Sequence, residues 1–522
     1  MTVQQNITSG KNVWLLPIFV FLGTFAVRFY LAYFSNVITP DGILYIKTAK
    51  LIELGESNKL MEFTFIHLYP FFVLLVHKII PDWELAGRMT SVLMGSLAVI
   101  PFFLLIKGIF DIRIAAVSSF FYAISPRLAD YSSDVLREPT FWFFSIMALW
   151  LAWEGISRGR LLYIVFSSIS TGLSAFARIE GIAVFILIFL WIIWYFLKLK
   201  PDCRKLALYL FVFIFTIPVL LLPFIFFFSE KLSKWDFGFT ILKIWLLLTS
   251  KSKESLELTT DIVRVMPPEL PTFLDLAKSH KYVIFLSDVI LKLVKSINVL
   301  FAFLAIFGIF RRKNIPYSRN EVLIAIWFGV FFITAFLYIS KVFYFSTRHG
   351  LLMGIPMLVW SGIGFFEIKD RIYNWFKRAY PFHFFTRNIT ISLILAILII
   401  ILPKTLFPGG YDKRELKKAG VYLKSMGYSG VRFAGEPCLY RIAFYADSEY
   451  SPFLSAKTTD ELVDFMRENK ADLLIFDKNT NNVFYKNVQN NIDSTTFEKI
   501  NLPEFEKFRE YKISVYRLKN GS

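Results

Sequence analysis

The chain has 522 residues and a net charge of +18; 56% of its residues are hydrophobic and only 19% are charged. Soluble domains carry about 25% charged residues, so this composition excludes a soluble globular protein, a disordered chain and a fibrous one. Apolar runs of about 18 residues or more recur along the sequence, and runs of this length are typical of membrane-spanning helices.

Eleven apolar runs predict spanning helices. They lie at 13–35, 84–107, 113–128, 139–157, 161–178, 180–198, 206–228, 287–310, 320–340, 348–367 and 388–407. A further run, 67–80, is too short for a comfortable span, so we expect a re-entrant or interfacial helix there. The sequence therefore predicts an α-helical polytopic membrane protein with about eleven transmembrane helices.

Basic residues indicate how these spans are oriented. With the N-terminus in the cytoplasm, the five short inner loops carry 17 Lys and Arg residues, as the positive-inside rule requires. If 67–80 were a full span, the most basic loops would lie outside the membrane. We therefore predict an integral protein of the plasma (inner) membrane with a cytoplasmic N-terminus, outer loops at 36–83 and 229–286, and an extracytoplasmic C-terminal part.

Residues 408–522, called the tail below, differ from the transmembrane domain predicted at 1–407. Charged residues become frequent there, and apolar runs shrink to the length of strands. The expected elements are helices at 412–426 and 458–468, the second opened by a Thr458–Glu461 capping box, and strands at 431–434, 473–476 and 513–516. Helices that alternate with short strands predict a small α/β domain.

Ionisable residues beside a membrane are functional candidates, and the first of them follows the first span. Asp41 stands in the segment ITPDG, ahead of an apolar stretch with Tyr45 that predicts an interfacial helix. Two interpretations of Asp41 remain open on spacing alone. It either caps that helix or acts as a base at the membrane surface.

Three more outer corners supply charges of both signs. They are DYSSDVLREPTF with Asp134, Arg137 and Glu138, ARIEG with Arg178 and Glu180, and STRHG with Arg348 and His349. Glu138 either complements the dipole of the following helix or is a second carboxylate at this face. Arg348 either orients its span or binds a lipid phosphate. Carboxylates and cations at one membrane face suit a reaction between a lipid phosphate and a polar acceptor.

The order of these motifs resembles the C-type glycosyltransferases of the protein O-mannosyltransferase and aminoarabinose-transferase kind. The resemblance covers most of the chain and rests on TPDG, HLYP, AGRMTSVLMGSLAVIPFFLL, DVLREP, ARIEG, STRHGLLMGIPM and, in the tail, RIAFYAD. One departure is Gly42, because many members have a second acidic residue directly after the first. The sequence also lacks the paired-Trp signature of oligosaccharyltransferases, which argues against transfer of whole glycans to asparagine.

The resemblance implies the C-type glycosyltransferase fold and an inverting hexosyl- or pentosyltransferase. Such an enzyme moves a sugar from a polyprenyl- or dolichyl-phosphate donor to a hydroxyl of a protein, glycan or lipid at the outer membrane face. Asp41 would be the general base, which is worth about 10²–10⁴-fold in rate. Glu138 would orient the acceptor or the sugar, or help to hold a divalent metal if one is used. Arg348 would bind the leaving phosphate.

Further residues are expected to bind substrate, and two other classes of function stay open. The remaining candidates for substrate binding are Arg178, Glu180, His349, Tyr69, His67, Asp134, Arg137 and Tyr45. No cofactor beyond a divalent metal and no nucleic acid is expected; the partners are the lipid donor, the acceptor and membrane lipids. A secondary transporter or lipid flippase would place more ionisable residues at span midpoints. A cell-surface glycan ligase or polymerase would share the outer site and differ in using a lipid diphosphate.

Overall fold

A computed structural model describes residues 15–35, 37–56, 67–227, 279–342, 344–379, 388–409, 413–453, 459–480, 483–490, 492, 495–502 and 512–519. Up to residue 227 the helices are α1 (Leu15–Phe34), α2 (Pro40–Glu53), α4 (Leu68–His77), α5 (Trp83–Leu97), α6 (Val99–Ile109), α7 (Ile112–Ile124), α8 (Pro126–Ser133), α9 (Glu138–Arg158), α10 (Leu161–Ala177), α11 (Gly181–Trp194), the π-helical turn η1 (Tyr195–Leu199) and α12 (Cys203–Phe227). The second half of the bundle contains α17 (Lys281–Ile297), α18 (Val299–Phe310), the 3₁₀ turn η2 (Arg319–Glu321), α19 (Val322–Val342), α20 (Thr347–Ala379) and α22 (Ile389–Thr405). Most of the predicted outer loop 229–286 lies outside the described residues.

Helices coincide with all the apolar runs, so the chain is a mostly helical integral membrane protein. In the described part, six helices are long and apolar enough to cross a membrane, and a bent pair makes a seventh. Four shorter apolar helices of 10–17 residues are α4, α7, α10 and α22. The short run predicted as an interfacial or re-entrant helix forms α4. The count of eleven spans stays a prediction.

The run predicted as one span at 287–310 is divided between two helices, and whether the pair crosses the membrane once stays a prediction. α17 and α18 are bent by 107° relative to each other. The break falls at Asn298, whose φ of 84° is uncommon for a residue with a side chain but is adopted most readily by Asn and a few others. Its Oδ1 accepts a hydrogen bond from the backbone N–H of Leu300 at 3.1 Å and so caps α18. Hydropathy stays high through the break, which is why the sequence did not show it.

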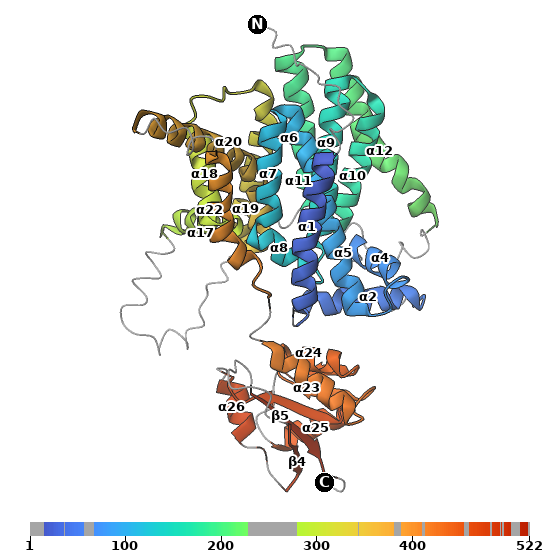
Figure 1. Cartoon of the computed structure of the whole chain (residues 1–522). Coiled ribbons are helices and arrows are strands. Elements are labelled where there is room, and N and C mark those ends of the chain that lie inside the picture. The colour runs from blue at the N-terminus through green and yellow to red at the C-terminus, as the bar shows by residue number, and fades with distance from the viewer. Residues whose placement is uncertain are drawn as a thin grey trace.

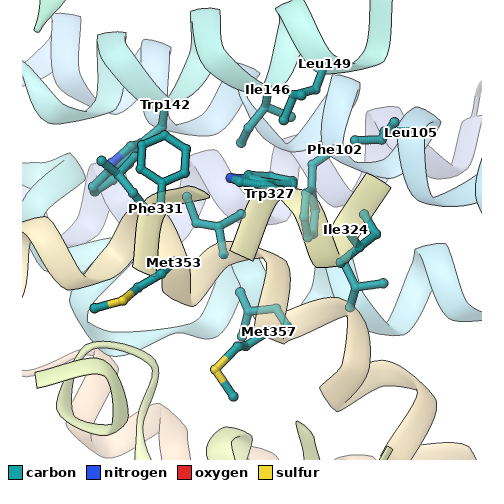
Figure 2. Close-up of a cluster of buried hydrophobic side chains, with 14 of the residues drawn as sticks. Phe102, Leu105, Trp142, Ile146, Leu149, Ile324, Trp327, Phe331, Met353 and Met357 are labelled. Atoms are coloured by element: carbon teal, nitrogen blue, oxygen red, sulfur yellow. The ribbon is translucent and has the colours of Figure 1, made fainter. Parts of the chain in front are cut away.

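The bundle core fixes the helices that carry the candidate site. Figure 2 shows Trp327 of α19 among side chains of α6 and α9, including Phe102 and Ile146. These three side chains are at most 2% exposed. Within a membrane such contacts stabilise through close packing rather than through release of water. α20 packs on α7, α18 and α19, and the first turns of α20 and α9 carry two of the predicted site residues.

The tail forms one five-stranded sheet with helices on both faces, as the predicted α/β class requires. Its elements are α23 (Arg414–Ser425), β1 (Arg432–Gly435), the 3₁₀ turn η4 (Pro437–Leu439), α24 (Tyr440–Tyr445), β2 (Glu449–Pro452), α25 (Thr459–Glu468), β3 (Leu473–Asp477), α26 (Val483–Asn490), β4 (Phe497–Ile500) and β5 (Ile513–Leu518). The strand order is β2-β1-β3-β5-β4. β1 pairs in parallel with β2 and β3, whereas β5 is antiparallel to β3 and β4.

The central strand β3 is buried along its whole length. The sequence analysis missed β2 and β4, which are short edge strands of four residues with polar side chains. Thr458 of the predicted capping box lies outside the described residues. The division of the chain at 407/408 stays a prediction.

The tail meets one end of the bundle, called the tail-side end below. In Figure 1, α23 and α24 lie between the sheet of the tail and the end of the bundle that carries α2 and α5. Tyr445 of α24 belongs to the same buried cluster as Ile38, Ile46 and Val135. The tail therefore packs directly on the segment that leads into α2.

Candidate functional site

Six of the predicted residues form one continuous set of charge contacts at the tail-side end. This charged network consists of Asp41, Arg348, Glu138, Arg178, Glu180 and His349. The residues come from the first turns of α2, α20 and α9 and from the turn between α10 and α11. Four segments far apart in the sequence are thus brought together, and their charges alternate along the network.

Arg348 lies between the two carboxylates that were predicted to be catalytic. Its Nη1 is 2.5 Å from Asp41 Oδ2 and 3.6 Å from Glu138 Oε1. The Asp41 side chain is 43% exposed and that of Arg348 33%, whereas that of Glu138 is only 3% exposed. The network therefore has an accessible end at Asp41 and Arg348 and a buried end at Glu138. Reactants could approach from the accessible end.

Arg178 compensates the buried carboxylates. Its Nη1 donates to Glu138 Oε1 at 2.5 Å, and its Nε and Nη2 donate to the two oxygens of Glu180 at 3.1 and 2.6 Å. Such a bidentate pair fixes the orientation of the guanidinium as well as stabilising its charge. Burial alone would raise the pKa of Glu180, but the Arg178 guanidinium lowers that pKa to about 2. His349 Nε2 lies 3.8 Å from Glu180 Oε1 and extends the network.

One oxygen of Glu138 is not satisfied by protein groups. Among the described residues, Oε2 of Glu138 is buried and has no hydrogen-bond partner. A buried carboxylate oxygen without a partner carries a substantial desolvation cost. It is therefore an acceptor that a hydroxyl group of a substrate could satisfy.

The interpretation of Asp41 as a helix cap is wrong. The cap of α2 is Thr39, whose Oγ1 accepts a hydrogen bond from the backbone N–H of Gly42 at 3.3 Å. Pro40 occupies the first helical position, where its fixed φ suits a helix start. Asp41 is the next residue along, in the first turn of α2, and its carboxylate contacts Arg348 instead.

Gly42 and Gly87 enclose Val135 and so join α2 to the corner before α9. A Cβ on Gly42 would lie 2.9 Å from Val135 Cβ and 3.0 Å from Val135 O. A Cβ on Gly87 would lie 2.8 Å from Val135 Cγ1. Thr39 Oγ1 also donates to Val135 O at 3.4 Å. This close contact leaves no room for a second acidic side chain at position 42, which accounts for the departure seen in the sequence.

Arg137, His67 and Tyr45 form an aromatic and cationic group beside the network. Arg137 Nη1 lies 2.6 and 2.9 Å from the two ring nitrogens of His67. The Tyr45 ring meets the His67 ring edge-on, with 6.2 Å between centroids. Burial, with a further contribution from Arg137, lowers the pKa of His67 to about 3. His67 is therefore neutral at pH 7.

Tyr69 and Asp134 make their contacts away from the charged network. Tyr69 is fully buried and its hydroxyl donates to Gly87 O at 2.8 Å. Asp134 Oδ1 accepts from the backbone N–H of Val135 at 2.7 Å and lies 3.9 Å from Arg88 Nη2. In the described part of the chain both side chains hold α5 against its neighbours. Their expected role in substrate binding stays a prediction.

Sequence reasoning missed a second set of polar residues that joins the tail to the bundle. This docking network consists of Glu84, Arg88, Tyr445 and Lys417. In the sequence, only Arg88 and the segment RIAFYAD stood out, because both belong to the motifs that carry the family resemblance. Tyr440, at the start of α24, is also near the site: burial, with the Asp41 carboxylate contributing, raises its pKa to about 12.

Residues 67–222 match the sequence model of a family described as dolichyl-phosphate-mannose-protein mannosyltransferase. The matched segment includes the corner before α9 and the α10–α11 turn, which carry Glu138 and Arg178. No curated protein sequence matches the chain.

Solved membrane-protein structures share the fold over nearly the whole chain. ArnT from Cupriavidus metallidurans bound to undecaprenyl phosphate has a TM-score of 0.59 at 11% identity, covering 98% of this chain and 99% of that one. AglB from Archaeoglobus fulgidus, with an inhibitory peptide and a dolichol-phosphate, has a TM-score of 0.53 at 14% identity, covering 90% and 70%. The oligosaccharyltransferase of that organism in complex with Zn and sulfate has a TM-score of 0.55 at 14% identity, covering 89% and 68%. The resemblance and the C-type glycosyltransferase fold predicted from the sequence are confirmed.

The residues of the network fit a divalent metal poorly. The described residues contain no group of three or more His, Cys, Asp and Glu side chains placed to hold a metal ion. At the centre of the network, Asp41 and Glu138 flank a guanidinium, which occupies the position that a cation would take.

Proposed function

We propose that this chain is an integral membrane glycosyltransferase that moves a sugar from a polyprenyl-phosphate donor to a hydroxyl acceptor. The observation that carries the proposal is the position of Arg348 between the accessible Asp41 and the buried Glu138. This arrangement offers a base for the acceptor and a cation for the lipid phosphate within one group of side chains. The family description and the lipid phosphates bound in the structural relatives support the same class of donor.

Asp41 acts as the general base in this proposal. Its carboxylate removes the proton of the acceptor hydroxyl while the hydroxyl oxygen forms a bond to the anomeric carbon. The bond between that carbon and the phosphate oxygen breaks, and its electron pair stays on the polyprenyl phosphate. A single displacement of this kind inverts the anomeric centre. Asp41 is suited to the task because it is the most exposed of the three carboxylates in the network.

Arg348 stabilises the charge that accumulates on the leaving phosphate. A guanidinium binds phosphate oxygens through two parallel hydrogen bonds, and a fixed cation at the developing charge lowers the barrier. Arg178 contributes to the same positive region, with His349 beside it, while Glu180 orients Arg178 through its bidentate pair. Glu138 orients the acceptor or the sugar through its unsatisfied oxygen.

The proposal places the reaction at the extracytoplasmic face of the plasma membrane. Its support is the 17 basic residues in the five loops on the opposite side. The donor approaches within the membrane, and the acceptor, a hydroxyl of a protein, glycan or lipid, approaches from the side of the tail. Both meet at the tail-side end, where Asp41 lies at the start of α2.

The experiment is a direct test of donor use by the purified full-length protein in lipid vesicles. Each radiolabelled polyprenyl-phosphate sugar is supplied in turn, and release of polyprenyl phosphate is measured. We expect consumption of at least one such donor, and loss of that activity in Asp41→Asn. Use of lipid diphosphate donors alone would show a glycan ligase or polymerase. Movement of a lipid or solute across the vesicle without bond cleavage would show a transporter, and either result overturns the proposal.

A further inference from the structure

Tyr445 connects the tail to the segment that leads into the helix with Asp41. Its hydroxyl accepts a hydrogen bond from the backbone N–H of Ile38 at 2.8 Å. The same hydroxyl donates to Glu84 Oε1 at 3.3 Å. The Tyr445 ring is 9% exposed and packs in the buried cluster that contains Ile38 and Val135. One side chain of the tail therefore contacts both α5 and the chain just ahead of α2.

Glu84 links this contact to the corner that precedes Glu138. Arg88 donates to Glu84 Oε1 from Nε at 3.2 Å and from Nη2 at 2.8 Å. Arg88 Nη1 also donates to Ser133 O at 3.3 Å. Lys417, in the tail, binds the other Glu84 oxygen at 3.1 Å. The docking network thus reaches both backbone segments that present the proposed catalytic carboxylates.

The backbone N–H of Ile38 requires the Tyr445 hydroxyl as its hydrogen-bond acceptor. The residue is 1% exposed and lies before α2, so its N–H has no helical acceptor. Buried backbone N–H groups are almost always hydrogen-bonded in native proteins. Here the acceptor comes from the tail, more than 400 residues further along the chain.

We propose that Tyr445 is a positioning residue, which sets the placement of Asp41 by holding the backbone of Ile38. Asp41 is three residues beyond Ile38, in the first turn of α2. Small errors in the placement of a reacting group reduce turnover strongly, by up to about 100-fold for a misplacement of about 1 Å. The tail then has a part in catalysis without touching the reactants. This inference rests on the proposed function for its effect on turnover.

Burial keeps the Tyr445 hydroxyl protonated. It raises the pKa of Tyr445, and the neighbouring Glu84 carboxylate raises it further. The hydroxyl therefore serves as a donor to Glu84 and an acceptor for Ile38 over the whole physiological pH range. A phenylalanine at this position would keep the ring in its cluster and remove both hydrogen bonds.

The test compares Tyr445→Phe with Tyr450→Phe in the full-length protein. Tyr450 is a matched control, because its hydroxyl donates to Glu436 O at 2.5 Å, a contact that lies within the tail. In Tyr445→Phe we expect kcat to fall by about 10–100-fold, with the KM for the donor close to the wild-type value. We also expect faster hydrogen exchange in the peptide around Ile38. Tyr450→Phe should change neither quantity.

Three outcomes would overturn the inference. The first is a kcat in Tyr445→Phe equal to that of Tyr450→Phe. The second is a fall in kcat of Tyr445→Phe with unchanged hydrogen exchange around Ile38, and the third is hydrogen exchange that becomes equally faster in both variants. Failure of the proposed function is a separate result: the wild-type protein would then consume no polyprenyl-phosphate sugar. In that case the exchange measurement still decides whether Tyr445 holds Ile38.

Discussion

Arg348 holds the carboxylate of Asp41, with 2.5 Å between Nη1 and Oδ2, although the two residues are 307 positions apart in the sequence. The pairing joins the first turn of α20 to the first turn of α2. It also means that Asp41 competes with any phosphate for the same guanidinium. The effects of substitutions at these two positions should therefore differ in kind.

Asp41→Asn should abolish the base while preserving the fold. The cap of α2 is Thr39, so the change does not remove the cap. Turnover should fall by about 10²–10⁴-fold, measured as initial rates with saturating donor. Donor affinity should persist or rise, because the Asp41 carboxylate, which competes with the donor phosphate for Arg348, has been replaced by a neutral amide. Asp130→Asn is the matched control, since Asp130 pairs with Arg127 outside the charged network. Near-normal turnover in Asp41→Asn would move the search for the base to Glu138 and Glu180.

Arg348→Ala should weaken donor binding, and Arg348→Lys should restore only part of it. An ammonium group carries the charge but cannot bind a phosphate through two parallel hydrogen bonds. The readout is the dissociation constant of a polyprenyl phosphate, measured with purified variants in detergent. Arg127→Ala serves as the control, because its side chain is 46% exposed and pairs with Asp130. Wild-type affinity in Arg348→Ala would leave Arg348 as an anchor of the helix alone.

Gly42→Ala should destabilise the protein by about 1–3 kcal/mol through overpacking. The new Cβ would lie 2.9 Å from Val135 Cβ and 3.0 Å from Val135 O, and neither atom can move away without a shift of the backbone. Gly23→Ala is the control, because a Cβ there meets nothing within 4 Å. Thermal unfolding in detergent gives the comparison. Equal stability of Gly42→Ala and Gly23→Ala would show that α2 does not press on Val135 as described.

His67 should make stability depend on pH. Its folded pKa of about 3 lies below the ordinary 6.5, so the unfolded chain binds a proton as the pH falls below about 6.5 while the folded chain does not. Stability is therefore complete above about pH 6.5 and declines toward pH 3, by up to about 1.4 kcal/mol per pH unit. His67→Gln should make this decline shallower in thermal unfolding curves. Arg178 and Glu180 also act on His67. The Glu180 carboxylate contributes to the pH dependence of stability mainly below about pH 4. An unchanged slope in His67→Gln would contradict the assignment of a neutral, buried imidazole.

The predicted topology has its own test. A reporter that is active only in the cytoplasm is attached after Ser522, and a second copy is inserted after Arg158, in a predicted inner loop. The first fusion should be inactive and the second active, because basic residues in short loops keep those loops in the cytoplasm. A strong cytoplasmic signal from the C-terminal fusion would reverse the orientation and place the site on the inner face.

The sequence by itself determined the class of protein and most of its elements. Apolar length marked the helices of the bundle, because the cost of placing polar groups in a bilayer depends on local composition. Alternation of amphipathic and strand-length segments marked the α/β tail in the same local way. The sequence also showed which charged residues stand at the ends of apolar runs, and six of these form the charged network.

Only the tertiary structure decided which of those groups meet. The pairing of Asp41 with Arg348, the enclosure of Val135 by Gly42 and Gly87, and the hydrogen bond from Ile38 to Tyr445 all join segments distant in sequence. No local pattern encodes such contacts, because they depend on how separate helices pack and on how the tail docks. The bend at Asn298 was not predicted for a related reason: hydropathy reports burial in the membrane and is insensitive to the direction of the backbone.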